Sequence, residues 1–263
     1  MFEVVSFLAF GLILGSFANV LILREETGET LGGRSHCASC ARTLEWYELF
    51  PVLSFLILRG RCRTCAGTIS LQYPLIELLL GAGVLAIGLA PIPLTHKLLS
   101  IPIVLILLAI AAYDFRTTYI PDRWAYLFAL LAFISGAVFL GGTSDPVYFL
   151  LAGPLVAASL FALWLVSGGK WMGLGDAKLT LGFGWLVGIL GGFIALALAF
   201  VLGAILGVVL IGITRFAAGS KRLTMKSEVP FGPFLIAALC IVWFSQLYGF
   251  DLVAFLAHFL SLR

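Results

Sequence analysis

Four cysteines, arranged in two pairs, have a spacing that suits metal binding. Cys37-x2-Cys40 and Cys62-x2-Cys65 are separated by 21 residues. Each C-x2-C pair places two thiolates on one ion, and two pairs complete the tetrahedral set that zinc prefers, with Zn–S bonds of about 2.3 Å. Because four thiolates leave no position for water, the predicted zinc is structural rather than catalytic.

Two disulfides or two redox pairs are the alternative to a metal site. A cytoplasmic location disfavours stable disulfides, because that compartment keeps thiols reduced. His36, next to Cys37, could replace a cysteine as a metal ligand, but it is interpreted as a surface residue. The fifth cysteine, Cys240, lies in an apolar stretch and is expected to pack there.

Carboxylates form the second group of candidates. Of the 13 acidic residues, nine are expected in loops, near turns or at the outer interface, and four remain as candidates within or at the ends of predicted spans: Glu77, Asp114, Asp122 and Asp176. Acids in such places are costly, and functional roles are the first hypothesis for them. Asp122 follows Pro121 at the start of an apolar segment and fits the plainer role of a helix N-terminal residue.

Asp114 and Asp176 are expected at the same membrane face, although 62 residues separate them. Two carboxylates that come together share one proton, so one takes a proton from water while the other donates to a peptide carbonyl. That pair suffices for peptide hydrolysis without a covalent intermediate. Helix capping is the alternative for both residues.

The segment around Asp176 reads Gly173-Leu174-Gly175-Asp176-Ala177-Lys178. Without side chains, Gly173 and Gly175 would allow an extended peptide to approach the carboxylate closely. Lys178 is counted with this active-site loop. It either pairs with one of the aspartates or belongs to the positive charges of the cytoplasmic face.

The elements that position these residues must be membrane helices. The chain of 263 residues is 62% hydrophobic and only 11% charged, whereas soluble proteins have about 25% charged residues. Its apolar runs are continuous rather than alternating, which excludes a β-barrel. The expected fold is therefore all-α, a polytopic transmembrane bundle of about eight spans, with seven or nine as alternatives.

The expected spans lie at about 4–23, 71–90, 98–113, 124–141, 147–167, 178–190, 192–214 and 231–248. The first is long enough to remain in the membrane and lacks the basic start of a signal peptide. A single helix over 177–214 would be about 55 Å long, so a hairpin is predicted at Gly191-Gly192. An apolar stretch after Asp251 extends or folds beside the last span.

Positive charges give an independent test of the span count. With the N-terminus outside, 14 of the 16 Lys and Arg residues fall in loops on one face, and only Lys97 and Arg263 remain on the other. The positive-inside rule makes the rich face cytoplasmic. Both the cysteines and the two aspartates then belong to that face.

The predicted domains are a first helix at 1–23, a cytoplasmic zinc-binding insert at 24–70 and a membrane-embedded bundle at 71–263. Within the insert, 51–58 is apolar but too short to cross, and is predicted to be interfacial or re-entrant. The pairs Gly11/Gly15, Gly184/Gly188 and Gly203/Gly207 are expected to allow close helix packing.

Seven segments, in order, resemble motifs of the bacterial type IV prepilin peptidases, which are GxGD-type membrane aspartyl proteases. They are GSFANV (15–20), CASC with LEWYE (37–48), LRGRCRTC (58–65), QYPLIE (72–77), DFRTTYIPD (114–122), GLGDAKL (173–179) and PFGP (230–233). The chain departs from the family at 48–51, where an Asn-containing stretch is common, and at Ala18, where Leu is common.

The resemblance implies that Asp114 and Asp176 are the catalytic pair. It implies cleavage of the basic leader from type IV prepilins and type II secretion pseudopilins at the cytoplasmic face of the bacterial inner membrane. N-methylation of the new amino terminus with S-adenosylmethionine would follow. No glycine-rich fingerprint locates that methyl donor, the oligomeric state is open, and no nucleic-acid partner is expected.

A transporter and an assembly protein without catalysis are the two alternatives to the protease. A proton-coupled transporter could use Asp114 and Asp176 as relay groups, but transporters commonly show repeated halves and midplane sites. Here the acids lie at helix ends and no repeat is visible. A zinc-stapled assembly protein without catalysis would leave the loop at 173–176 unexplained.

Overall fold

The computed structural model describes residues 2–30, 32–139, 145–216 and 230–250. Within these ranges all regular structure is helical, and only two isolated β-bridges occur. The all-α fold predicted from composition is therefore confirmed. The chain divides into two compact units between Ala112 and Tyr113. The domain boundaries expected from the sequence differ from this division and remain a prediction.

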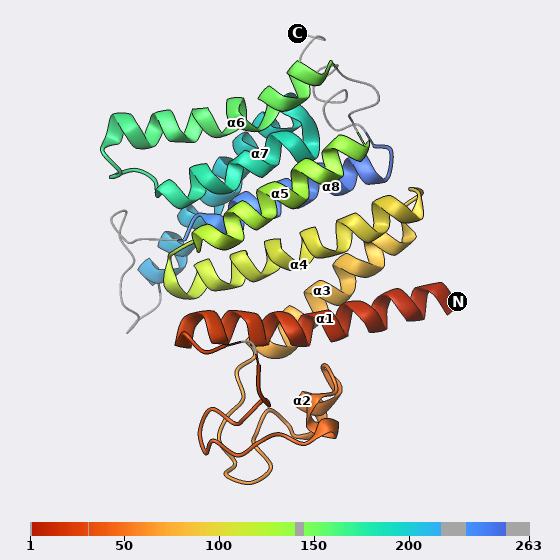
Figure 1. The fold of residues 1–263 in the computed structure, drawn as a ribbon. Helices are drawn as coiled ribbons and strands as arrows, with labels where there is room; N and C mark the ends of the chain where they lie inside the picture. The colour runs from red at the N-terminus through yellow and green to blue at the C-terminus, as the bar shows by residue number, and fades with distance from the viewer. Residues whose placement is uncertain (1, 31, 140–144, 217–229, 251–263) are drawn as a thin grey trace. The chain divides into compact units, whose positions relative to one another are not determined.

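In the first unit, α1 (Phe2–Thr27) and α3 (Gln72–Leu89) lie side by side (Figure 1). Glycines allow this contact. A Cβ atom added to Gly11 would come within 2.8 Å of the Gly81 Cα, and one added to Gly15 within 2.5 Å of the Glu77 Cα. Close packing was predicted for this pair of glycines, and the structure confirms it.

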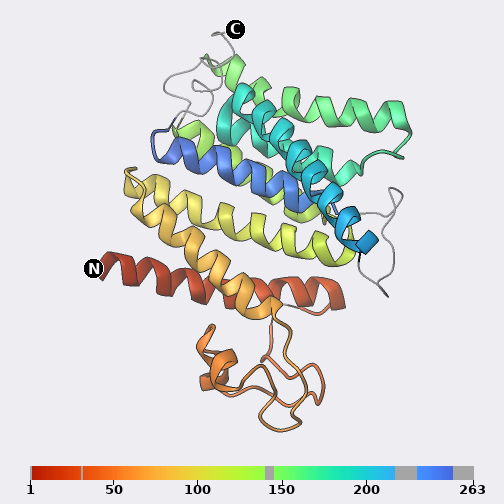
Figure 2. The same cartoon turned by 180° about the vertical axis from the view of Figure 1, so that it is seen from behind.

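The insert between these helices contains η1 (Trp46–Leu49) and α2 (Leu53–Ile57). Figures 1 and 2 both show α2 beside the α1–α3 pair, between the two ends of α1. Several of its large apolar side chains are exposed, namely Leu53, Leu56 and Ile57. An apolar surface on so short a helix is consistent with the interfacial or re-entrant placement, which stays a prediction.

The second unit contains the end of α4 (Leu94–Thr117), then α5 (Asp122–Phe139), α6 (Pro146–Ser167), α7 (Leu174–Phe216) and α8 (Gly232–Leu247). α7 packs against α5, α6 and α8. Its contact with α6 depends on Gly184, because an added Cβ atom would collide with the Ala152 carbonyl group. α7 is thus the central helix of this unit.

The predicted hairpin at Gly191-Gly192 is wrong in position. The backbone leaves helical geometry at Gly188, with φ 78° and ψ 169°. That region of backbone space is essentially open only to glycine. Gly188 therefore divides α7, and it does not act as a packing partner of Gly184. Periodicity alone did not distinguish the three nearby glycines.

Among the residues that the structure describes, six helices are long and apolar enough to cross a membrane, the last being Leu174–Val209, and α8 is a shorter apolar helix. The 36 residues of Leu174–Val209 would extend about 54 Å as one straight helix. The break at Gly188 separates them into two segments. Counting both segments and α8 agrees with the expected number of about eight.

Several sequence expectations fall outside the described residues. They are the positive charges in 217–229 and the apolar stretch after Asp251.

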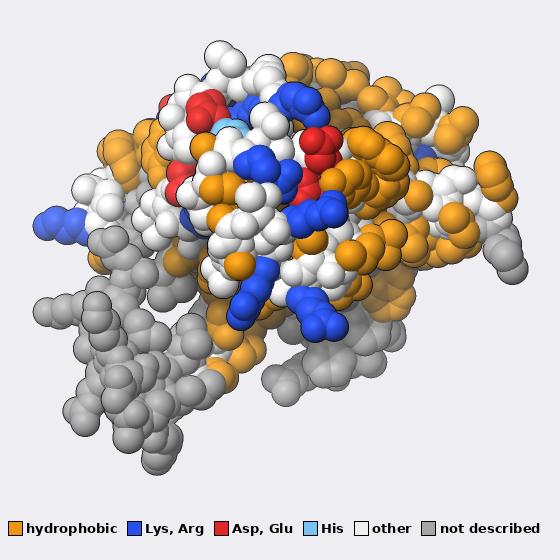
Figure 3. Space-filling model, turned by 90° about the horizontal axis from the view of Figure 1, so that it is seen from below, with side chains coloured by type: hydrophobic (Ala, Val, Ile, Leu, Met, Phe, Trp, Pro, Cys, Tyr) orange, Lys and Arg blue, Asp and Glu red, His pale blue; other side chains and the backbone are white. Residues whose placement is uncertain are grey.

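Within the insert, four arginines are exposed: Arg34, Arg59, Arg61 and Arg63. Figure 3 shows Lys and Arg side chains gathered on the face that the insert presents.

We predict that Gly15→Ala destabilises the protein while Gly207→Ala does not. The new methyl group at Gly15 meets the α3 backbone, and overpacking of this kind costs about 1–3 kcal/mol. Gly207 has nothing within 4 Å of an added Cβ atom, so its replacement should be neutral or slightly stabilising. Thermal unfolding of both variants in detergent measures the difference. Equal unfolding temperatures would contradict the packing role of Gly15.

Candidate functional site

The two cysteine pairs form two turns of the same construction. In the first, Cys37 N–H donates to Arg42 O at 2.9 Å, and Ala41 N–H donates to Cys37 O. In the second, Cys62 N–H donates to Gly67 O at 2.8 Å, and Ala66 N–H donates to Cys62 O. Each turn is closed by one β-bridge. The insert therefore presents two matching knuckles.

The knuckles bring all four sulfur atoms together. The Sγ atoms of Cys37, Cys40, Cys62 and Cys65 lie within 4.8 Å of one another, and the Cys37–Cys65 pair is 3.9 Å apart. Tetrahedral zinc with 2.3 Å bonds needs sulfur atoms roughly 3.8 Å apart. Because no disulfide forms and the four atoms fit one ion, the residues suit a metal of zinc type.

Backbone N–H groups prepare two of the four cysteines for a metal, whereas the pKa of Cys65 is raised to about 11, because the hydrogen bond from the Gly67 N–H is outweighed by contacts with Cys40 and by burial. The pKa of the Cys62 thiol is lowered to about 6, because the N–H groups of Cys65 and Thr64 donate to it. The pKa of Cys37 is lowered for the same reason, by the N–H groups of Cys40 and Ser39. Metal ions bind the thiolate form, so these donors favour binding.

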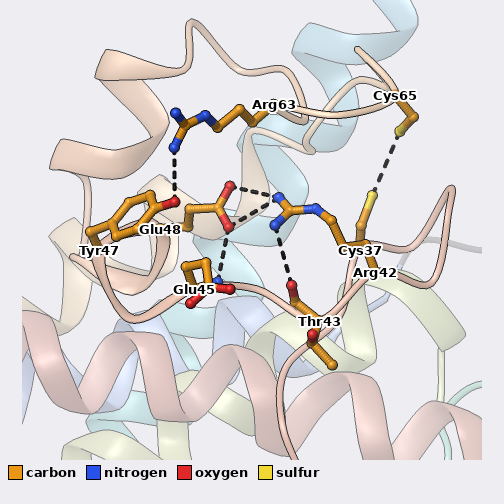
Figure 4. Close-up of polar contacts among 8 residues, drawn as sticks. All are labelled: Cys37, Arg42, Thr43, Glu45, Tyr47, Glu48, Arg63 and Cys65. Atoms are coloured by element: carbon orange, nitrogen blue, oxygen red, sulfur yellow. Dashed lines mark hydrogen bonds and ion pairs between the residues drawn. The ribbon is translucent and has the colours of Figure 1, made fainter.

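Beside the cysteines, a carboxylate of the insert is buried and paired (Figure 4). Both oxygens of Glu48 accept from Arg42 Nη2, at 2.7 and 3.0 Å, and one also accepts from the Glu45 N–H. The guanidinium of Arg42 and the Glu45 N–H hold the pKa of Glu48 below its usual value. Arg63 also donates to the Tyr47 hydroxyl. These contacts join η1 to both knuckles.

Asp114 lies in the last turns of α4 and is only 4% exposed. The predicted span ended before this residue, whereas the helix continues to Thr117. The N–H of Gly232, the first residue of α8, donates to Asp114 Oδ2 at 3.0 Å. The positive end of the α8 dipole therefore faces this carboxylate.

Asp176 lies in the first turn of α7 and is 9% exposed. Its carboxylate accepts a hydrogen bond from the backbone of Gly173, directly before the helix. A carboxylate that reaches back from the third helical position to the residue before the helix is half of a capping box. Capping was the alternative interpretation of Asp176, and the structure shows this contact.

The two aspartates are close enough for the charge of Asp114 to act on Asp176. Within the described residues, neither forms an ion pair with a lysine or arginine; their partners are backbone N–H groups. Like charges at such a site favour one shared proton. The arrangement therefore suits acid–base chemistry on a bound water and a carbonyl group.

Lys178 and Asp122 form an ion pair that leaves the two buried aspartates free of Lys178. Lys178 Nζ lies 2.7 Å from each carboxylate oxygen of Asp122, whose side chain is 51% exposed. Lys178 also lies over the Tyr126 ring, 5.9 Å from its centroid. Of the two positions that the sequence left open for Lys178, pairing with a buried aspartate is thus not observed.

The loop glycines have different surroundings. A Cβ atom on Gly175 would lie 3.1 Å from Ile120 Cβ, so Gly175 allows α7 to approach the segment after α4. A Cβ atom on Gly173 would have Asp176 Oδ2 as its nearest neighbour, at 3.5 Å. Open space for a peptide is therefore more consistent with Gly173 than with Gly175.

The structure shows two contacts of buried carboxylates that the sequence did not predict. Gly232 holds Asp114, and its only sequence signal was the PFGP segment. Glu77, which had remained among the four candidate acids, is buried and accepts the Val52 N–H at 2.7 Å. Spacing along the chain does not show such contacts between distant segments.

Two family models match successive parts of the chain. The family model described as the bacterial peptidase A24 N-terminal domain matches residues 9–90. The model of the type IV leader peptidase family matches residues 101–208. The first range includes the cysteines and Glu77, and the second includes Asp114 and Asp176.

Curated relatives match along almost the whole chain. A prepilin leader peptidase/N-methyltransferase of Aeromonas hydrophila is 32% identical over 91% of this chain and 89% of its own length. Proteins of the same name from Pseudomonas putida and Bacillus subtilis are 30% and 31% identical, over 91% and 94% of this chain and 90% and 94% of their own lengths. No solved structure matches the chain. At this identity and coverage, the chain belongs to the type IV leader peptidase family.

Proposed function

We propose that the protein is a membrane aspartic endopeptidase that removes the leader peptide of type IV prepilins and type II secretion pseudopilins. The observation that carries this proposal is the pair of buried carboxylates, Asp114 and Asp176, that lie within range of each other's charge and have no cation partner among the described residues. The names of the relatives support the substrate class.

In the proposed mechanism the two aspartates share one proton. The ionised carboxylate takes a proton from a water molecule, which attacks the scissile carbonyl carbon. The protonated carboxyl donates to the carbonyl oxygen, so no covalent enzyme intermediate forms. The Gly232 and Gly173 N–H groups orient the two side chains and leave oxygens for water and substrate.

The proposed location of cleavage is the cytoplasmic face of the bacterial inner membrane. Positive charge supports this orientation, since the exposed arginines of the insert would face the cytoplasm with the N-terminus outside. A flexible leader would enter from the cytoplasm. The apolar segment that follows it would lie among the helices, so the scissile bond stops near Asp114 and Asp176.

N-methylation of the new amino terminus is the second proposed activity, supported by the relatives' printed name. S-adenosylmethionine would supply the methyl group as a methyl sulfonium. The chain must then bind the product amine and hold it without its extra proton.

The proposed role of zinc is structural. Cys37, Cys40, Cys62 and Cys65 would occupy all four positions of the ion. A segment as short as the insert at 24–70 rarely buries enough apolar surface on folding to be stable alone. The metal would therefore hold the two knuckles together, and with them η1 and α2.

Replacing either buried aspartate by asparagine should abolish cleavage. Asp114→Asn and Asp176→Asn keep the shape of the side chain but remove the shared proton, and a loss of at least about 100-fold is expected. Asp122→Asn is the matched control, because Asp122 is exposed and paired with Lys178. The measurement is cleavage of a prepilin-type substrate in detergent or membranes.

The same assay gives a second test through pH. One shared proton predicts a bell-shaped dependence of the wild-type rate on pH. Equal cleavage by all four proteins would reject the catalytic assignment, and so would a monotonic pH profile together with active amide variants.

Gly232→Ala should also reduce cleavage. The new Cβ atom would lie 2.7 Å from Asp114 Oδ2, so the carboxylate must move. A displacement of this kind should lower the rate roughly 10- to 100-fold. Gly203→Ala is the control, because its Cβ atom makes ordinary contacts of 3.6 Å or more with Phe231 and Phe234. If both variants cleave like the wild type, Gly232 does not position Asp114.

Metal analysis tests the insert. Purified protein should contain about one zinc per chain, and Cys40→Ser should lose most of it, because three thiolates hold the ion less tightly. Cys240→Ser should keep the metal, since this cysteine is not part of the cluster. A folded wild-type insert without metal, or equal zinc in both variants, would contradict the site.

A further inference from the structure

The first unit contains a buried carboxylate of its own. Glu77 of α3 is 7% exposed and packs against Gly15 of α1. Gly15 is the fourteenth of the 26 residues of α1, about 20 Å from its start along a helix of about 39 Å. Glu77 therefore lies beside the middle of an apolar helix. An acid buried in a contact between two apolar helices calls for a functional explanation.

The partners of Glu77 are neutral. Its Oε2 accepts the Val52 N–H at 2.7 Å, and its carboxylate also accepts from the Ser16 hydroxyl. Within the described residues no lysine or arginine pairs with it. Buried acids in membranes usually have a charged partner, so the charge of this carboxylate is uncompensated.

A second acceptor in the same helix contact has no partner. Asn19 is 2% exposed, and its Nδ2 donates to Gly15 O at 3.2 Å and to Tyr73 O at 3.1 Å. Its Oδ1 is buried without any hydrogen bond in the described structure. Asn19 follows Ser16 by one turn on α1, and Tyr73 precedes Glu77 by one turn on α3. The α1–α3 contact thus holds an unpartnered oxygen near an uncompensated carboxylate.

The contact from Val52 is held in a strained turn. Val52 has φ 62° and ψ −47°, and Leu53 N–H donates to Pro51 O at 2.6 Å, which makes a γ-turn. A β-branched residue rarely adopts positive φ. Strain of this kind is typical of functional sites.

The site offers hydrogen-bond acceptors but no compensating cation, and this composition determines the kind of ligand that it would bind. A carboxylate, a hydroxyl and an amide oxygen match a group with positive charge and several N–H donors. A primary amine fits this description, because its ammonium form has three donors. Leader cleavage creates one such amine, at the start of an apolar segment that lies in the membrane.

We propose that Glu77, with Ser16 and Asn19, binds the new amino terminus of the cleaved substrate and accepts its proton before methylation. This rests on the proposed methyltransferase activity. The ammonium gives a proton to the Glu77 carboxylate, and the nitrogen lone pair then attacks the methyl carbon of the sulfonium donor. The C–S bond breaks, its electrons remain on sulfur, and the methylated amine keeps the positive charge.

Glu77→Gln is the central variant of the test. Glutamine still accepts the Val52 N–H, so the insert keeps its attachment to α3, but the negative charge is gone. Methylation per cleaved product should fall roughly tenfold or more, the value of a hydrogen bond between charged groups. Glu3→Gln is the matched control at the exposed start of α1. Mass spectrometry of the product counts both cleavage and methylation.

Two further readouts separate binding from a merely structural role. Wild type should bind cleaved peptide with a free amine more tightly than the N-acetylated peptide, without methyl donor, and Glu77→Gln should lose that preference. The α-amino group of a peptide loses its proton near pH 8, so methylation by the variant should recover above about pH 9. Ser16→Ala, which removes one partner of Glu77, should show a smaller loss of the same kind.

The outcomes distinguish this inference from the proposed function. If wild type cleaves but never methylates, the proposed methyltransferase activity fails and this assignment fails with it. If wild type and Glu77→Gln methylate equally and bind both peptides equally, only the role of Glu77 is rejected. If the variant loses cleavage, methylation and zinc together at every pH, Glu77 serves only to hold the insert.

Discussion

Hydrocarbon offers no hydrogen bonds, and the structure meets this constraint with backbone donors at the three buried acids of its apolar helices. Asp114 accepts from Gly232, Asp176 from Gly173 and Glu77 from Val52. In lipid each unsatisfied polar group costs several kcal/mol. The donors lie at the starts of helices or in a strained turn, where N–H groups have no helical partner. The starts of helices therefore lie beside these acids and supply their hydrogen-bond donors.

A backbone donor stabilises a carboxylate without neutralising it. Asp122 and the buried Glu48 of the insert show the other solution, since Asp122 pairs with Lys178 and Glu48 with Arg42. Those pairs bring a compensating cation, which leaves little affinity for a further positive group or proton. Asp114, Asp176 and Glu77 have no such cation among the described residues, so their charge is not compensated. The choice of partner therefore separates the acids that hold the fold from those available for chemistry.

Much of this was predictable because lipid limits the possibilities. Continuous apolar runs predicted the helices, and the two C-x2-C pairs predicted the sulfur cluster that the structure contains. The break in α7 was misplaced by three residues, because Gly188, Gly191 and Gly192 look alike until backbone angles are known. Gly232 and Val52 were missed because their contribution is an N–H group, which every residue but proline has. The catalytic roles of Asp114 and Asp176 stay predictions.

The two units hold different sets of candidate functional residues. Asp114, Asp176 and their backbone donors all belong to the unit that starts at Tyr113. The cysteine cluster, the γ-turn at Val52 and Glu77 belong to the other. Zinc would hold the insert in shape, and the insert in turn presents Val52 to Glu77, so loss of metal would disturb that contact before it reached the aspartates. An effect of metal removal on methylation greater than on cleavage is therefore the behaviour that this division implies.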